Sequence, residues 1–257
     1  MVVDVAINNY VATVTMNRPE ALNAFNPEQM RAVIDAFDLL REDDRVRVAI
    51  LTGAGERSFA AGADIKAMAH MTSEEGFAFG RLGHELANAV ELFPRPVIAA
   101  VNGFALGGGC EIALASDIRL ASETAVFAQP EVTLGIPPGW GGSQRLTRLI
   151  GPGLAAELIY TGRRVKADEA LKLGLVNAVF PLGELMPAAR ALADSIAKNS
   201  PRAVAQSKRL IRLALNGSID EGLAAEARAF GEAFETEDQR EGMGAFVEKR
   251  TATFTGR

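Results

Sequence analysis

Hydrophobic and polar side chains alternate along the first sixteen residues of the chain. Residues 2–7 and 11–16 follow this period of two, which is typical of short strands. Residues 8–10 between them are Asn-Asn-Tyr, and Asn tolerates the left-handed backbone that tight hairpins need. We therefore expect the chain to begin with a β-hairpin.

Helical periodicity begins at residue 26. Asn26 and Pro27 are typical of the N-cap and the first position of a helix. The apolar residues that follow share one helical face: Met30, Val33, Ile34, Phe37 and Leu40. This spacing predicts an amphipathic helix.

Apolar runs then alternate with helical segments. Residues 46–51 and 96–101 predict buried strands on either side of a helix at residues 73–92. Shorter strands are expected at residues 117–121 and 125–127. The alternation predicts an α/β fold with parallel strands.

After residue 180 the pattern is helical throughout. Helices are expected at residues 183–198, 201–215, 219–235 and 237–249. Two of them begin as capping boxes, with Ser218 three residues before Glu221 and Thr236 three residues before Gln239. We expect an α/β body over residues 1–195 and a helical region over residues 196–257, which can dock either on its own body or on a neighbouring subunit.

Composition and charge exclude several classes of protein. The chain has 257 residues, 48% of them hydrophobic, with a net charge of −5 and no basic run, so we expect no nucleic-acid partner. No apolar run is long enough to span a membrane, and no signal peptide is recognisable, so a cytoplasmic protein is expected. His70, His84 and Cys110 lack the spacing of a metal site, so no metal is expected.

Two glycine-containing segments follow the first buried strand. Residues 52–58 start as G-x-G but carry Ser58 at the third glycine position and precede no amphipathic helix, which disfavours a dinucleotide site. Residues 60–64 are all small except Asp64, and small residues let backbone N–H groups approach a ligand. The alternative is a tight loop before a helix capped by Asp64.

A third segment combines glycines with an acid. Gly107, Gly108 and Gly109 precede an apolar helix, and a helix start exposes unpaired N–H groups that favour an anion. Glu111 lies in the first turn, where an acid also stabilises the helix dipole. A carboxyl group in apolar surroundings has a raised pKa and is a candidate acid or base.

Glu131 also lies among apolar residues, after Gln129-Pro130. Alone, it is more easily interpreted as a surface acid. Ser143 lacks the G-x-S-x-G context of a hydrolase nucleophile, and Cys110 is better explained as a small buried residue than as a nucleophile.

Taken together, four segments resemble the crotonase (enoyl-CoA hydratase/isomerase) superfamily. They are residues 17–24 (NRPEALNA), 59–65 (FAAGADI), 102–111 (NGFALGGGCE) and 129–146 (from QPE to GGSQRL). The resemblance covers nearly the whole chain. It implies a spiral of ββα units over residues 1–195 that holds the coenzyme A and active site. It also implies a helical C-terminal region over residues 196–257 that serves oligomerisation into a homotrimer or a dimer of trimers.

The resemblance also implies roles for individual residues. Backbone N–H groups of Ala61 and Gly108 match the oxyanion hole for a thioester carbonyl, and Glu111 and Glu131 match the two glutamates of the hydratases. Positions matching the coenzyme A and acyl site are Ala21, Leu22, Ala24, Ala61, Gly62, Ala63, Asp64, Ile65, Gly108, Gly139 and Trp140. Trp140 departs from the small residue that many hydratases have there, which leaves the acyl preference open.

These positions predict an enoyl-CoA hydratase that adds water to 2-trans-enoyl-CoA and gives 3-hydroxyacyl-CoA. Coenzyme A is expected only as part of the acyl-CoA thioester substrate, with no separate cofactor. An enoyl-CoA isomerase or another crotonase-type enzyme is the alternative within the superfamily. A non-catalytic RNA-binding member is a remote alternative, since the chain lacks a basic stripe.

Overall fold

Two sheets of different size organise the body of the protein. The computed structural model describes residues 1–257, apart from the side chain of Ala67. The larger sheet has the order β1-β2-β3-β5-β7-β10, with β1 antiparallel to β2 and the other strands parallel. Its strands are β1 (Val3–Asn8), β2 (Val11–Met16), β3 (Val48–Gly53), β5 (Val97–Val101), β7 (Ile118–Ser122) and β10 (Ala178–Phe180). The predicted hairpin and parallel α/β core are confirmed.

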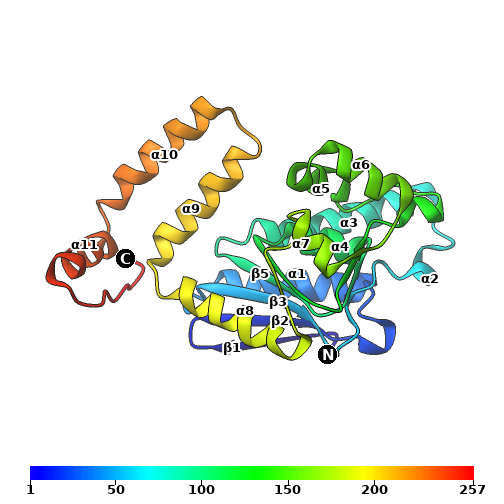
Figure 1. The fold of residues 1–257 in the computed structure, drawn as a ribbon, viewed down its shortest axis with the longest axis horizontal. Coiled ribbons are helices and arrows are strands. Elements are labelled where there is room, and N and C mark those ends of the chain that lie inside the picture. The colour runs from blue at the N-terminus through cyan, green and yellow to red at the C-terminus, as the bar shows by residue number, and fades with distance from the viewer.

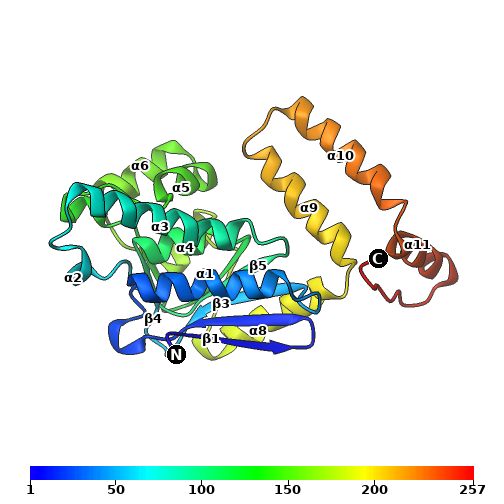
Figure 2. The same ribbon diagram turned by 180° about the vertical axis from the view of Figure 1, so that it is seen from behind.

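Helices cover both faces of the larger sheet (Figures 1 and 2). Helices α1 (Pro27–Arg41) and α3 (Ser73–Glu91) lie on one face, and α8 (Leu182–Ala197) lies on the other. Alternate residues of β3 enter the two hydrophobic clusters between these layers. Because both faces of the sheet are covered by helices, the residues of β3 form a continuous apolar run.

The smaller sheet has the order β4-β6-β8-β9, and β4, β6 and β8 are parallel. Its strands are β4 (Ser58–Ala60), β6 (Phe104–Leu106), β8 (Val126–Ala128) and β9 (Val165–Lys166). Strands β4 and β6 were not predicted, because three residues between glycines carry too little periodicity to be recognised.

Along the chain, successive strands are added alternately to the larger and the smaller sheet. Three times, a strand of the larger sheet is followed by a strand of the smaller sheet and then by a helix. These helices are α2 (Ile65–Met68) with α3, then α4 (Gly108–Ala115), then the 3-10 helix η2 (Glu131–Leu134). Helices α5 (Gly142–Ile150), α6 (Pro152–Thr161) and α7 (Ala167–Lys172) complete the body. The repeat is the predicted spiral of ββα units.

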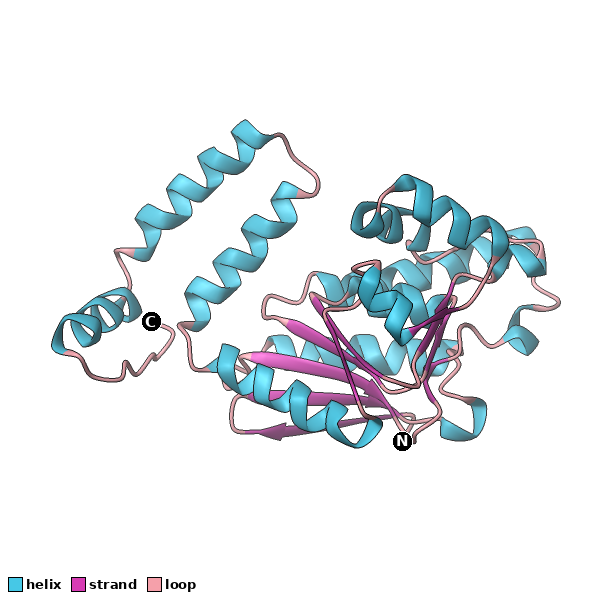
Figure 3. Cartoon of the chain, viewed as in Figure 1, coloured by secondary structure: helices cyan, strands magenta, loops and turns pink.

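The last three helices project from the body (Figures 1 and 3). They are α9 (Pro201–Ala214), α10 (Ile219–Ala233) and α11 (Glu237–Glu248). Ser218 and Glu221 form the expected capping box, whereas Thr236 caps α11 only through the backbone N–H of Gln239. Helix α8 still packs on the larger sheet to Ala197, two residues beyond the boundary predicted at residue 195.

Candidate functional site

Three segments of the predicted site follow the carboxyl ends of three neighbouring strands. Residues 61–65 follow β4, residues 107–111 follow β6, and residues 129–131 follow β8. The strands are parallel, with Ala60 opposite Ala105 and Leu106 opposite Ala128. Because the carboxyl ends of parallel strands meet at one edge of a sheet, segments 70 residues apart converge there.

The glycines before α4 allow this close approach. Gly107 has a φ of +49°, and a Cβ atom there would lie 2.8 Å from Oε1 of Glu131. A Cβ atom on Gly109 would lie 1.9 Å from the carbonyl oxygen of Ala60. Only residues without a side chain fit between the smaller sheet, α4 and Glu131.

The carboxylate of Glu111 is buried, with 1% of the residue exposed. Its Oε1 accepts hydrogen bonds from the backbone N–H groups of Trp140 and Gly142, both at 2.7 Å. Burial raises the pKa of Glu111, and the two N–H donors oppose that rise by stabilising the charged form. The predicted apolar environment of Glu111 is therefore present.

Glu131 is the first residue of η2 and is 9% exposed, so its interpretation as a surface acid is wrong. Burial, and next the negative charge of Glu111, raises the pKa of Glu131 to about 7. With its amide nitrogen toward Glu131, the buried Gln129 donates to both carboxylate oxygens at 3.2 and 3.3 Å. Gln129 was not among the predicted site residues. Its signal in the sequence is its position just after a strand and two residues before Glu131.

The two carboxyl groups differ in their surroundings. Glu111 receives two backbone N–H bonds that favour its ionised form, whereas Glu131 feels the charge of Glu111 and retains a proton to a higher pH than an ordinary glutamate. A pair of acids with different protonation preferences can accept a proton at one group and donate one at the other.

The structure contradicts one residue of the predicted oxyanion hole. The N–H of Ala61 donates to the carbonyl oxygen of Leu22 at 3.0 Å, so this N–H is not free to bind a ligand oxygen. Within the part of the chain that the structure describes, the N–H groups of Ala63 and Gly108 donate to no protein acceptor. They lie just beyond the adjacent strands β4 and β6, so both are free to bind a ligand oxygen at this edge.

The predicted coenzyme A segments lie against each other. Phe25 pairs with Ala63 in an isolated β-bridge, with the N–H of Phe25 on the oxygen of Gly62 and the N–H of Asp64 on the oxygen of Phe25. Arg18 joins the same two segments, because it donates to the oxygen of Ala24 at 2.6 Å and lies 3.7 Å from the Asp64 carboxylate. The structure thus brings residues 21–24 and 61–64 together.

Two buried asparagines hold the loop between β3 and β4, and neither of them was predicted to have this role. The side-chain amide of Asn23 donates to the oxygens of Ala54 and Ser58, at 3.0 and 2.8 Å. That of Asn102 donates to the oxygens of Gly53 and Gly55, at 3.0 and 2.7 Å. The loop leads into strand β4 rather than a helix, which excludes the dinucleotide site considered for residues 52–58.

Trp140 is buried beside this site, whereas its neighbour Gly139 is exposed. The indole packs edge-to-face against Phe25 and Phe79, with ring centroids 5.7 and 5.5 Å apart.

Burial raises the pKa of the Cys110 thiol to about 12, so this thiol is not a nucleophile at neutral pH. Cys110 is the small buried residue that the sequence indicated.

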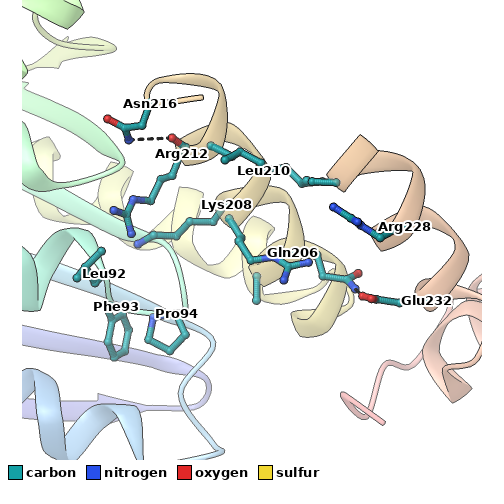
Figure 4. A pocket seen from close by; sticks show the side chains of 14 residues that line it. Leu92, Phe93, Pro94, Gln206, Lys208, Leu210, Arg212, Asn216, Arg228 and Glu232 are labelled. Carbon is teal, nitrogen blue, oxygen red and sulfur yellow. Dashed lines mark hydrogen bonds between the residues drawn. The ribbon is translucent and has the colours of Figure 1, made fainter. Parts of the chain in front are cut away.

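The protein has a separate cavity between the body and the projecting helices (Figure 4). Its volume is about 760 Å³, and its lining comes from residues 92–94 and from helices α9 and α10 with the residues next to them. Neither Glu111 nor Glu131 lines it. Among the described residues, no group of acids, histidines or cysteine has the arrangement of a metal site, and no helix is long and apolar enough to cross a membrane.

The sequence and the fold of this chain are similar to those of known proteins. The profile of the family described as Enoyl-CoA hydratase/isomerase matches residues 6–257. The chain is 54% identical over 240 residues to a short-chain-enoyl-CoA hydratase of Clostridium acetobutylicum, covering 93% of this chain and 92% of that protein. It is 47% identical over 244 residues to a crotonyl-CoA hydratase of Syntrophomonas wolfei, covering 95% and 94%. The crystal structure of an enoyl-CoA hydratase from Bacillus anthracis superimposes with a TM-score of 0.97 at 41% identity over the full length of both chains.

Proposed function

This chain belongs to the enoyl-CoA hydratase/isomerase family, and we propose that it hydrates 2-trans-enoyl-CoA thioesters to 3-hydroxyacyl-CoA. It is an enzyme of the enoyl-CoA hydratase type, as its relatives from Clostridium acetobutylicum and Syntrophomonas wolfei indicate. The observation that carries the proposed reaction is the buried pair Glu111 and Glu131, with the charge of Glu111 raising the pKa of Glu131.

In the proposed reaction, the thioester oxygen binds between the N–H groups of Ala63 and Gly108. Ala63 replaces Ala61 in this role, because the Ala61 N–H is bonded to Leu22. Negative charge grows on the thioester oxygen as the enolate forms, so donors fixed beforehand stabilise the transition state more than the substrate. Gly108 opens α4, whose N-terminal dipole adds to this effect.

Two protons move during the reaction. The oxygen of water forms a bond to C3, and one of its protons passes to the carboxylate of Glu111. The electron pair of the double bond, held as the enolate, takes the proton of Glu131 at C2. Return of a proton from Glu111 to Glu131 after the product leaves restores both groups for the next turnover. This assignment gives the base role to the carboxylate with two N–H donors and the acid role to the group whose pKa lies at about 7.

We propose that coenzyme A binds only as part of the substrate, against the joined segments 21–24 and 61–65.

We also propose a homotrimer or a dimer of trimers. Support comes from large apolar side chains exposed on the projecting helices, such as Phe230, Phe246 and Val247, since apolar surface of this kind is usually covered in an assembly. A cytoplasmic location stays a prediction.

Incubation with crotonyl-CoA tests the function. We expect loss of the absorbance of the conjugated thioester and a product heavier by one water. Migration of the double bond of a 3-enoyl-CoA without any water addition would instead show an isomerase. Light scattering during size-exclusion chromatography gives the number of subunits, and a monomer would exclude the proposed assembly.

A further inference from the structure

The two N–H groups that bind Glu111 come from one short turn just before α5. Those of Trp140 and Gly142 both lie 2.7 Å from Oε1 of the carboxylate. A single peptide unit, which carries the carbonyl of Trp140 and the N–H of Gly141, joins the two donating peptides. Peptide units are planar and turn as a whole, so rotation of this unit would turn the donors away from Glu111. The position of the proposed base therefore depends on the orientation of one peptide unit.

Gly141 allows the shape of this turn but does not fix it. Its φ is +103°, a conformation that favours glycine. Because glycine has no Cβ atom, it can also leave this conformation at little steric cost, so a restraint has to come from a neighbouring group. A Cβ atom on Gly141 would lie 2.2 Å from Nη1 of Arg145. The guanidinium group of Arg145 therefore lies directly against this glycine.

Arg145 binds both carbonyl groups of the turn. Its Nη1 donates to the oxygen of Trp140 at 2.9 Å, and its backbone N–H donates to the oxygen of Gly141 at 2.9 Å. Glu91 of α3 holds the guanidinium in turn, since it accepts from Nε at 3.1 Å and from Nη2 at 2.5 Å. The two side chains are 17% and 28% exposed, so water competes less for this pair than for an ion pair on the open surface. Helix α3 thus restrains the turn through Arg145.

Arg145 also places a positive charge near Glu111. After the two backbone hydrogen bonds, this charge opposes the rise in the pKa of Glu111 that burial causes. The charged and titratable groups on the elements around the carboxylate are Glu131 of η2, Cys110 of α4, Arg145 and Arg148 of α5, and His84 and Glu91 of α3. Glu131 has the opposite effect to Arg145, because two negative charges repel each other.

We propose that Arg145 is a positioning residue for the proposed base, because its bond to the Trp140 carbonyl keeps both N–H donors on Glu111. The inference rests on the proposed hydratase function and adds to it a residue that acts through the carboxylate without touching the substrate. Displacement of a catalytic group by about 1 Å can cost about 100-fold in rate. An arginine that only joined α3 to α5 would affect stability, but not the kinetics and titration of Glu111.

The first test measures kcat and KM for crotonyl-CoA in Arg145→Met, Arg145→Lys and Glu91→Gln. Methionine removes the charge and the side-chain hydrogen bonds, so kcat should fall by about 10- to 100-fold with little change in KM. Lysine keeps the charge and should recover part of that loss. Glu91→Gln leaves Arg145 without its ionic partner and should also lower kcat, even if the methionine variant fails to fold. Native kcat in a folded Arg145→Met or in Glu91→Gln would overturn the inference.

The matched control is Arg190→Met. Arg190 of α8 pairs with Asp194 at 2.9 Å and donates to the carbonyl oxygen of Asn8 at 3.0 Å. It therefore makes the same two kinds of contact as Arg145, but on the face of the larger sheet opposite α3. This variant should keep the native kcat, and its change in Tm shows what the loss of one such arginine costs in stability alone.

A double-mutant cycle with Glu111→Gln separates positioning from stability. If Arg145 acts through the carboxylate, Arg145→Met should cause little further loss of kcat once Glu111 is replaced. Losses that multiply in the double variant would show that Arg145 acts independently of Glu111 and would refute the positioning role.

Titration of Glu111 tests the inference without turnover and so separates it from the proposed function. NMR of protein labelled with ¹³C-glutamate follows the carboxyl carbons, and the signal of Glu111 is the one that Glu111→Gln removes. Its midpoint should rise by about one pH unit in Arg145→Met, because the carboxylate loses a nearby positive charge and its well-placed donors. The acid limb of kcat/KM should move in the same direction. An unchanged midpoint would overturn the inference, whereas absence of hydration with every substrate would count against the hydratase function alone.

Discussion

The backbone N–H of Trp140 lies 2.7 Å from Oε1 of Glu111, and the side chain of the same tryptophan lies against Gly108. One residue therefore touches the proposed base through its main chain and the proposed oxyanion donor through its indole. The position of the carboxylate consequently depends on how the indole packs between α3 and α4.

Replacement of Glu111 by Gln should remove proton transfer while preserving its hydrogen bonds. The amide oxygen can still accept from the N–H groups of Trp140 and Gly142, so we expect a native-like Tm. Loss of one acid or base typically costs about 10²–10⁴ in turnover, and kcat for crotonyl-CoA should fall by that factor. Glu123→Gln on the surface is the control. Near-native turnover of the Glu111 variant would exclude its role as base.

Glu131 should make both activity and stability depend on pH. In the folded protein its pKa is about 7, above the ordinary 4.5, so the folded state holds a proton that the unfolded state has released. This stabilising contribution is complete below about pH 4.5 and is lost as the pH rises through about 7. At about pH 8 the uncharged Glu131→Gln should therefore have a higher Tm than the native protein.

The gain in stability should be at most about 3 kcal/mol, because one pKa unit corresponds to about 1.4 kcal/mol. It should shrink towards about pH 5, which differential scanning calorimetry can measure. Since the proposed acid must be protonated, kcat/KM of the native enzyme should fall above about pH 7. A Tm difference that is constant with pH would contradict the raised pKa.

Gln129→Leu should move the alkaline limb of the pH profile to higher pH. The amide of Gln129 donates to both oxygens of Glu131, and hydrogen bonds of this kind favour the charged form of a carboxylate. An apolar residue removes both bonds, so Glu131 should keep its proton longer. The pH dependence of kcat/KM reads out this shift, and a limb at the native position would show that Gln129 has only a packing role.

Gly83→Ala should disturb catalysis from a distance. The added Cβ would lie 2.0 Å from the indole, so ring and backbone at Trp140 must move, and with them the N–H on Glu111. Overpacking of this kind costs about 1–3 kcal/mol in stability, and we expect at least a tenfold loss of kcat, roughly the effect of one misplaced hydrogen bond. Thermal unfolding and turnover of crotonyl-CoA measure the two effects.

Gly76→Ala on the same helix provides the control. No heavy atom lies within 4 Å of a Cβ atom at residue 76, and alanine is the better helix former by about 1 kcal/mol. This variant should be slightly more stable and fully active. If Trp140→Leu restores activity to Gly83→Ala, the effect passes through the indole; additive losses would refute that path.

Lys208→Met should loosen α9 from the body. The Lys208 side chain is 7% exposed, and its Nζ donates to the Arg95 carbonyl at 3.0 Å and to Asp117 at 2.7 Å. We expect a loss of about 1–3 kcal/mol and faster hydrogen exchange along α9, because these are hydrogen bonds to a charged group. The exposed pair Lys172–Asp168 should contribute almost nothing, so Lys172→Met is the control.

Most of the secondary structure follows from local chemistry along the chain. The N-cap of Asn26, the capping box of Ser218 and Glu221, and the apolar runs of β3 and β5 were all predicted correctly. Helix ends are fixed by hydrogen bonds within about four residues, and strands buried on both faces are apolar throughout. Glu111 was likewise recognisable, since an acid in an apolar helix start stands out.

Tertiary structure decided what depends on partners far along the chain. The burial of Glu131, the N–H of Ala61 bonded to Leu22, and the amide of Gln129 on Glu131 all arise where loops from three strands meet. The same holds for Trp140, because the space for its indole is made by Gly83 and Gly108, which lie 57 and 32 residues away along the chain. By itself the sequence determined the residue types and the local geometry of the site. Which N–H groups stay free, and which residues enclose the indole of Trp140, are decided only by packing between distant segments.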